Sequence, residues 1–349
     1  MKKNIYLFIV LLLCLPTFVH ASGCMEASSD EGVSVVGYLQ NQFEYLIDND
    51  ENESSFTFNR ARMGLVGNIP YDFSYYIMFE FSPYKNGPYL LDGFITYSRL
   101  SPYLEISLGQ FKSPFSLELN TPCQKLHTIN RSNVVTNLAN PFRDLGLLIE
   151  GKHKDLLKYA FAITNGSGLN EVENNDTKDY AGRVVLSPFS LLSVGGGFSI
   201  KTLLPASVGA SDPDKLYRYA VELQLEMGEF LVQGEYLMAS YESSGGTVHH
   251  PADCSGPAWD EVIPAGTTER NGYWAQAMYM TDWNIQPIIK YETYEPNIDF
   301  GNDIESIVTF GVNYFFNDWT RLQLNYLYKY EEFEVYNDEI LLQLQVVLN

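Results

Sequence analysis

Two arginines separated by one residue, Arg60 and Arg62, could carry chemistry, because side chains two positions apart share one face of a strand. A guanidinium presents a planar fork of N–H donors that matches the oxygens of phosphate groups. If the strand crosses a bilayer, each arginine would cost roughly 2–4 kcal/mol on the lipid side. We therefore expect both to face water, with Asp92 placed to orient one of them.

A second group of cations lies in the stretch 112–143. Its members are Lys112, Lys125, Arg131 and Arg143. Glu118 alone opposes them in this stretch, although the whole chain carries a formal charge of −21. Distant acids are screened by salt over about 8–10 Å, so a local excess of cations can govern a narrow passage. A ring of Arg and Lys selects anions or phosphate in this way.

A helix-start signal lies within the same stretch. Thr121 is followed by Pro122 and, three positions after the threonine, by Gln124. A threonine cap, proline at the first helical position and glutamine at the third are typical of a helix start. We expect a short helix over 122–132. One face would carry Gln124, Thr128 and Arg131, with Lys125 near its edge and Leu126 and Ile129 packed against a wall.

The elements that position these residues alternate apolar and polar residues with period two, from about residue 33 to the C-terminus. Such segments are typical of strands with one apolar and one polar face. Seven connections are tight: 68–72, 100–103, 152–155, 187–190, 228–229, 281–282 and 317–318. The others are mostly longer: 47–54, 112–142, 165–178, 203–216, 241–271, 295–303 and 331–338. The pattern predicts an all-β fold, a transmembrane antiparallel up-and-down β-barrel of about 16 strands, with fourteen as the alternative count.

The polar face of these strands is expected to line the lumen. In 217–227, Arg218, Glu222, Gln224 and Glu226 share that face. Glu235 and Glu292 are expected there as well. The segment 54–68 departs from the pattern, because Phe56 and Phe58 share parity with the two arginines. A β-bulge that resets the register would separate them, and a position at the outer end of the strand is the alternative.

Composition and the N-terminus agree with export to a membrane. Aromatic residues make up 14% of the chain, with 25 Tyr, which suits the aromatic girdles of a barrel. After about residue 24, no apolar run approaches the roughly 18 residues of a membrane helix. Residues 1–23 read as a signal peptide, and 24–349 as a single barrel domain. The expected location is the outer membrane of a Gram-negative-type bacterium. The acidic balance argues against nucleic acid as a partner.

The cysteines leave two questions open. Cys123 and Cys254 fall in long connections on the same side of the expected barrel, where a disulfide or two separate thiols would both be possible. Residues 21–24 faintly resemble a lipoprotein cleavage site that ends at Cys24. Cys24 is therefore either a lipidated residue or an ordinary one.

Four short motifs carry a resemblance to a known family. They are FNRARMGL (58–65), LGQFKSPFSLE (108–118), RDLG (143–146) and ITNG (163–166). Together they resemble the phosphate-selective porin O and P family, along most of the mature chain. The resemblance implies a sixteen-stranded, usually trimeric barrel with an inward-folded third extracellular loop. It also implies an anion path lined by arginines and lysines, in which Arg60, Arg62, Lys112 and Arg131 match family positions.

The expected function is passive diffusion of small anions, phosphate among them, past a constriction. Its expected lining is Arg60, Arg62, Asp92, Lys112, Lys125, Arg131 and Arg143. The expected partners are these anions, outer-membrane lipid and lipopolysaccharide, and further copies of the chain in a homotrimer. No cofactor or metal is expected.

Three other functions remain open at this point. A general, cation-preferring or saccharide porin would use the inward-facing glutamates. An adhesin would use the long loops. An enzyme is the third, but the sequence has neither a Gly-x-Ser-x-Gly elbow nor an HExxH zinc motif. The residues His127, His249 and His250 are therefore expected not to be catalytic.

Overall fold

The computed structural model describes residues 32–48, 53–69, 72–207, 212–250, 259–301, 303–331 and 337–348. The strands are β1 (Gly32–Asp48), β2 (Glu53–Ile69), β3 (Phe73–Glu80), β4 (Tyr89–Leu100), β5 (Leu104–Lys112), β6 (Arg143–His153), β7 (Leu157–Thr164), β8 (Asp179–Phe189), β9 (Leu192–Leu203), β10 (Asp214–Met227), β11 (Phe230–Ser243), β12 (Gly246–His250), β13 (Trp259–Ile263), β14 (Gly266–Tyr279), β15 (Ile285–Glu295), β16 (Glu305–Asn317), β17 (Thr320–Glu331) and β18 (Asn337–Leu348). The helices are η1 (Pro83–Lys85), α2 (Leu117–Asn120), η2 (Cys123–Lys125) and α3 (Asn133–Leu138). Among the described residues, no helix is long and apolar enough to cross a bilayer. The expected signal peptide and Cys24 lie outside the described residues.

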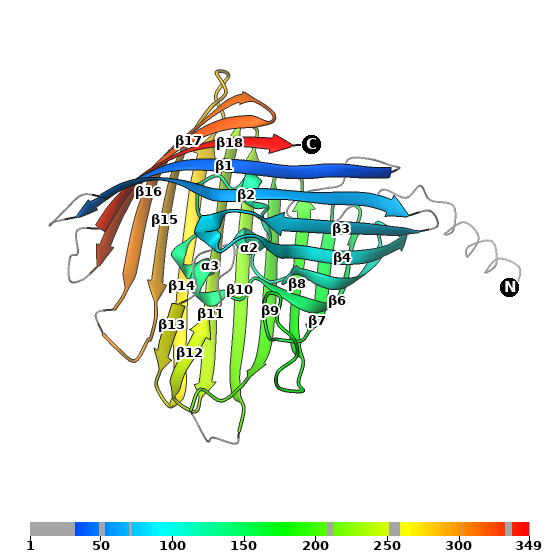
Figure 1. The fold of residues 1–349 in the computed structure, drawn as a ribbon. Coiled ribbons are helices and arrows are strands. Elements are labelled where there is room, and N and C mark those ends of the chain that lie inside the picture. Colours follow the sequence, from blue (N-terminus) through cyan, green and yellow to red (C-terminus); the bar gives the residue numbers. More distant parts are fainter. Residues whose placement is uncertain are drawn as a thin grey trace, which may run out of the picture.

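Sixteen of the described strands close into one antiparallel barrel (Figure 1). The first and last strands complete it, with Gly37 opposite Leu348 and Asp48 opposite Asn337. The predicted barrel of sixteen strands is confirmed, and the alternative count of fourteen is wrong. The hairpin β12–β13 forms a separate sheet in the connection between β11 and β14. Each connection predicted to be tight joins two consecutive barrel strands, so one end of the barrel carries short turns and the other long loops.

The two faces of the strands follow the predicted alternation. In β10, Arg218 and Glu222 point inward and are buried, whereas Tyr219 and Val221 point outward and Val221 is 62% exposed. A ring of apolar and tyrosine side chains therefore covers the outside of the barrel, as a lipid environment requires. The inward faces carry glutamine, asparagine, arginine, lysine and glutamate.

Strand β2 contains the predicted bulge. Gln40 of β1 pairs with Arg60, but the next residue, Asn41, pairs with Phe58, so Asn59 is the extra residue. Beyond the bulge, Phe56 faces outward and is 79% exposed, while Arg60 is 2% exposed and faces inward. One additional residue thus places the phenylalanines in the lipid and the arginines in the interior.

Candidate functional site: the interior of the barrel

A long segment between β5 and β6, residues 113–142, occupies the interior of the barrel. Figure 1 shows its helices α2 and α3 surrounded by strands. On one wall, Asn313 of β16 and Gln323 of β17 donate hydrogen bonds to the carbonyl of His127, at 2.9 and 3.1 Å. Gln345 of β18 donates to the carbonyl of Gln124. We call residues 113–142 the interior segment. Inward-facing amides of the strands hold its backbone in place.

Another part of the wall, formed by β11 and β14, holds the interior segment through a carboxylate. Glu235 of β11 accepts hydrogen bonds from Ser116 Oγ at 2.9 Å and from the backbone N–H of Leu117 at 2.8 Å. Trp274 Nε1 of β14 donates to the same carboxylate at 3.2 Å. Glu235 is therefore committed to the start of α2 and to a tryptophan, and is not a bare negative charge in the lumen.

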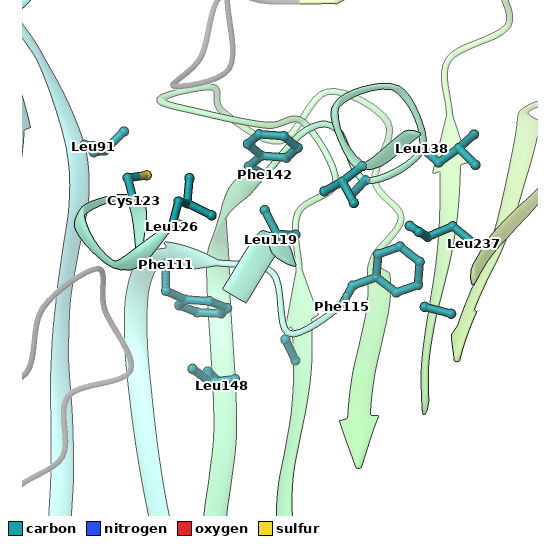
Figure 2. Close-up of a cluster of buried hydrophobic side chains, with 14 of the residues drawn as sticks. Leu91, Phe111, Phe115, Leu119, Cys123, Leu126, Leu138, Phe142, Leu148 and Leu237 are labelled. Atoms are coloured by element: carbon teal, nitrogen blue, oxygen red, sulfur yellow. The ribbon is translucent and has the colours of Figure 1, made fainter. Parts of the chain in front are cut away.

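The interior segment also has an apolar core of its own. Figure 2 shows Phe115, Leu119 and Phe142 of this segment gathered with Phe111, Leu148 and Leu237 of the barrel wall. Such packing excludes water and resists displacement. The interior segment therefore divides the barrel into a region near the short turns and a region near the long loops.

Arg60 and Arg62 point into the barrel, but the interior segment covers both. Arg62 Nε lies 2.7 Å from Glu80 Oε2, and its Nη1 lies 2.6 Å from the Tyr38 hydroxyl. Arg60 Nη1 donates to Gln40 Oε1 at 2.9 Å and to the carbonyl of Ile129 at 3.4 Å. Both side chains are 2% exposed, so neither makes direct contact with a passing solute.

The expected role of Asp92 in orienting Arg60 or Arg62 is wrong. Asp92 forms a two-pronged ion pair with Arg143, at 2.8 Å to Nε and 3.1 Å to Nη2. The strand register explains why Arg62 pairs with Glu80 and not with Asp92, because Glu80 lies opposite Arg62 in the β2–β3 pair. The nearer carboxylate therefore takes that arginine, and the Arg143 charge is neutralised by Asp92.

Arg131 stabilises the interior segment from within. Its Nε donates to the carbonyl of Glu118 at 3.0 Å, and its Nη2 to those of Leu119 and Thr121 at 3.2 and 2.8 Å. Its guanidinium carbon lies 5.6 Å from the centre of the Phe142 ring. Arg131 thus satisfies the carbonyls at the end of α2.

The expected helix over residues 122–132 is wrong. A single 3-10 turn, η2, replaces it, and the backbone is extended at Leu126. The reason is competition for hydrogen bonds, since the N–H of Ile129 goes to Asn325 of β17 and not to a residue in its own segment. Leu126 and Ile129 are nevertheless buried, as the apolar spacing indicated, and Lys125 is exposed.

Cys123 lies between two of these arginines. Its sulfur is 3.3 Å from Arg62 Nη1 and 3.4 Å from Arg131 Nη1. Cys254 lies outside the described residues, so the two alternatives for these cysteines, a disulfide or separate thiols, stand as the sequence left them.

A cavity of about 480 Å³ lies between the interior segment and the short turns. We call it the short-turn cavity. Its cationic lining residues are Lys112, Lys125, Lys152, Lys158 and Arg183. Glu105 and Glu150 are its acidic ones. Arg183 forms an ion pair with Glu222 at 2.6 Å. Lys125, Lys152 and Lys158 form no ion pair among the described residues, so this cavity is positively charged.

A second cavity, of about 390 Å³, lies on the other side of the interior segment, beneath the long loops. We call it the long-loop cavity. It contains Lys201, Arg218 and Arg270, and among acids Glu261. Lys201 pairs with Asp179 at 2.7 Å and Arg270 with Glu261 at 2.6 Å. Cations thus line both approaches to the interior segment.

A family model confirms the resemblance carried by the four motifs. The model of the phosphate-selective porin O and P family matches residues 36–211, half of the chain. The chain belongs to this family. It is an outer-membrane porin, a barrel that forms a channel. None of the curated proteins matches the sequence.

Solved porin structures share the fold of this porin at low sequence identity. The anion-selective porin from Comamonas acidovorans has a TM-score of 0.66 and 11% identity, covering 91% of this chain and 99% of that one. OmpT of Vibrio cholerae in a trimer form has a TM-score of 0.61 and 13% identity, with the same coverage of both chains. OmpF of Salmonella typhi in complex with daunomycin has a TM-score of 0.61 and 12% identity, covering 93% and 100%.

The motifs of this porin bind one another in space. Asp144 of RDLG accepts a hydrogen bond of 2.5 Å from the N–H of Gly166 of ITNG. Gln110 of GQF donates to the carbonyls of Leu90 and Leu91, and accepts from the N–H of Asn170 at 2.8 Å. These contacts join the entry and exit of the interior segment to the loop after β7. The motifs therefore position that segment.

Sequence reasoning missed several cations that line the cavities of this porin. They are Lys152, Lys158, Arg183, Lys201 and Arg270. The inward parity of each strand was the available signal, as it was for Arg218. Parity alone does not tell which inward cations share a cavity, because that depends on which strands the closed barrel brings together.

Proposed function

We propose that this porin conducts small anions in preference to cations, with phosphate among them. The observation that carries the proposal is the charge of the short-turn cavity, in which Lys125, Lys152 and Lys158 form no ion pair among the described residues. In a confined space with protein walls, a few such charges outweigh loop acids that lie beyond the screening length. The expected order of events is entry through one cavity, passage beside the interior segment and exit through the other.

The inward-facing glutamates do not favour a cation-preferring porin. Glu222 accepts two hydrogen bonds from Arg183, at 2.8 and 2.6 Å. Glu292 lies 3.5 Å from Lys290 Nζ, and Glu235 holds the start of α2. Since cations or N–H donors already engage these carboxylates, they contribute little net attraction for a passing cation.

Electrical recording in planar bilayers tests the proposal. In a potassium chloride gradient, the reversal potential is expected to show anion preference, and added phosphate is expected to reduce the chloride current. The double variant Lys152→Gln, Lys158→Gln is expected to lower the anion-to-cation permeability ratio by roughly twofold to fivefold per charge, from a Coulomb energy of up to about 1 kcal/mol each in water.

Lys154→Gln is the control, because Lys154 lies in the turn that joins the strands of Lys152 and Lys158 but does not line the cavity. It is expected to leave the ratio unchanged. A wild-type reversal potential on the cation side would overturn the proposal. Equal effects of the control and of the double variant would remove the short-turn cavity from it.

We also propose a homotrimer in the outer membrane, in contact with lipid and lipopolysaccharide. The trimer form of OmpT supports it as a structural neighbour of the same fold. Chemical cross-linking of the protein in native membranes is expected to yield species of three times the chain mass, and a monomer alone would contradict the proposal.

A further inference from the structure

The long-loop cavity combines apolar walls with cations. Along the inward faces of β10 and β11, apolar residues deeper in the barrel, such as Ala220 and Leu237, pack into the core of the interior segment. Towards the long loops, Leu216 of β10 and Ala239 of β11 line the cavity. Its apolar side is completed by Leu203 at the end of β9 and by the loop residues Leu204, Pro205 and Ala206. An inorganic anion gains no free energy from contact with such an apolar surface, whereas a hydrocarbon group gains free energy when it is removed from water.

Arg218 is the cation of this cavity that has no carboxylate within ion-pair distance among the described residues. Its Nη1 donates to the carbonyls of Leu138 and Asn140 at 3.1 and 2.7 Å, and its Nη2 to Ser199 Oγ at 2.8 Å. It is 3% exposed, and among the described residues it forms no ion pair and its Nε has no hydrogen-bond partner. Its guanidinium carbon lies 5.4 Å from the centre of the Phe115 ring.

The carboxylate of Asp179 acts on Arg218 through its charge, but it already pairs with Lys201. A buried guanidinium without an ion-pair partner of its own is costly, so Arg218 attracts an anion. The two other cations of the cavity differ, because Lys201 and Arg270 already have carboxylate partners. A ligand that brings its own negative charge to Arg218 and its own hydrocarbon to the leucines would use both features of the cavity. At about 390 Å³, the cavity lies within the range of roughly 300–1,000 Å³ that small-molecule sites occupy.

We propose that the long-loop cavity is a binding site for organic anions, namely carboxylates with a short apolar body. The carboxylate lies towards Arg218, and the hydrocarbon lies against Leu203, Leu204 and Leu216. The inference rests on the proposed anion conduction and narrows its substrate class. It assigns to the cavity a selectivity that depends on the size of the apolar group, in addition to charge.

A series of carboxylates tests the site in planar bilayers. Acetate, butyrate and hexanoate are added in turn to each side of the membrane, and the reduction of chloride current is measured. The half-blocking concentration is expected to fall by up to about fourfold for each added methylene, which corresponds to about 0.8 kcal/mol per buried methylene. The dependence is expected when the carboxylate is added from the long-loop side.

Leu204→Ser is the informative variant, because Leu204 is 54% exposed and its replacement leaves the barrel wall unchanged. It is expected to weaken block by hexanoate several-fold while leaving block by acetate unchanged. Val172→Ser is the matched control, since Val172 is an exposed loop residue that does not line the cavity. Arg218→Gln is expected to weaken block by all three acids, but it also loses two carbonyl contacts, so Leu204→Ser decides.

The outcomes separate this inference from the proposed function. Equal half-blocking concentrations for the three acids, in a channel that still prefers anions, would overturn the organic-anion site alone. The same chain-length dependence in Leu204→Ser as in wild type would also overturn it. A channel with no anion preference in the salt gradient would overturn the proposed function and this inference with it.

Discussion

Glu118 of the interior segment and Lys290 of β15 form a buried ion pair, with 2.7 Å between Oε1 and Nζ. The other oxygen of Glu118 accepts hydrogen bonds from the backbone N–H and the hydroxyl of Ser132. One carboxylate thus joins the start of the interior segment, the residue that precedes α3 and the wall of the barrel.

Breaking this pair on one side is expected to release the interior segment. Lys290→Gln leaves Glu118 and Glu292 buried near each other, and losing one partner of a buried pair costs about 3–5 kcal/mol. The strands provide the barrel's stability elsewhere, so the variant is expected to insert but to show larger and noisier single-channel currents. In the double variant Glu118→Gln, Lys290→Gln the charge conflict is reduced, and the currents are expected to return towards wild type. Wild-type conductance in Lys290→Gln would contradict this role.

Arg60 and Arg62 are expected to differ in their effect on selectivity. Arg62 is neutralised by Glu80, whereas Arg60 forms no ion pair among the described residues. Arg60→Gln removes an uncompensated charge and is expected to lower the anion-to-cation permeability ratio by roughly twofold to fivefold. The double variant Arg62→Gln, Glu80→Gln keeps the net charge and is expected to leave the ratio unchanged. Reversal potentials check both, and an equal loss of selectivity in the two proteins would refute the distinction.

Deleting Asn59 is expected to leave insertion of the barrel intact. Asn59 is the extra residue of the bulge in β2, so its removal makes Phe58 and Arg60 direct neighbours, which alternate between the two faces of a regular strand. The phenylalanines then still face outward and the arginines inward. Deleting Ala61 instead makes Arg60 and Arg62 neighbours, so one arginine turns towards lipid at a cost of up to roughly 2–4 kcal/mol, and this variant is expected to insert poorly. Heat-modifiable migration on gels reports folding, and loss of folding in the Asn59 deletion beside normal folding of the Ala61 deletion would disprove the account.

His127 is expected to make stability depend on pH. It belongs to the interior segment and not to a strand, and burial lowers its pKa from 6.5 to about 4. Between these two values the unfolded chain binds more protons than the folded one, so the free energy of unfolding falls as pH falls through this window. The stabilisation is fully present above about pH 6.5, and its loss is at most about 3 kcal/mol.

The measurement compares urea unfolding of wild type with that of His127→Gln at pH 7, 5.5 and 4. Glutamine does not titrate, so the difference between the two proteins is expected to shrink as the pH falls. A difference that stays constant from pH 7 to pH 4 would show that His127 does not carry this dependence.

The sequence by itself determined the barrel. The alternation in strands such as β10, the seven tight turns and the parity conflict at Phe56 and Phe58 were all local signals. They could be interpreted without knowing the partners of any strand, because the side-chain period of a strand is two and the lipid imposes one apolar face.

Only the tertiary structure decided the interior. The expected helix over 122–132 gave way to extended chain because the N–H of Ile129 meets Asn325, which lies 196 positions away. Arg62 took Glu80 as its partner and Asp92 took Arg143, according to strand register. Lys125 and Lys158 line one cavity because closure of the barrel brings their segments together. Charges and hydrogen-bond donors act over a few ångströms in space, and sequence distance carries no information about which of them will meet.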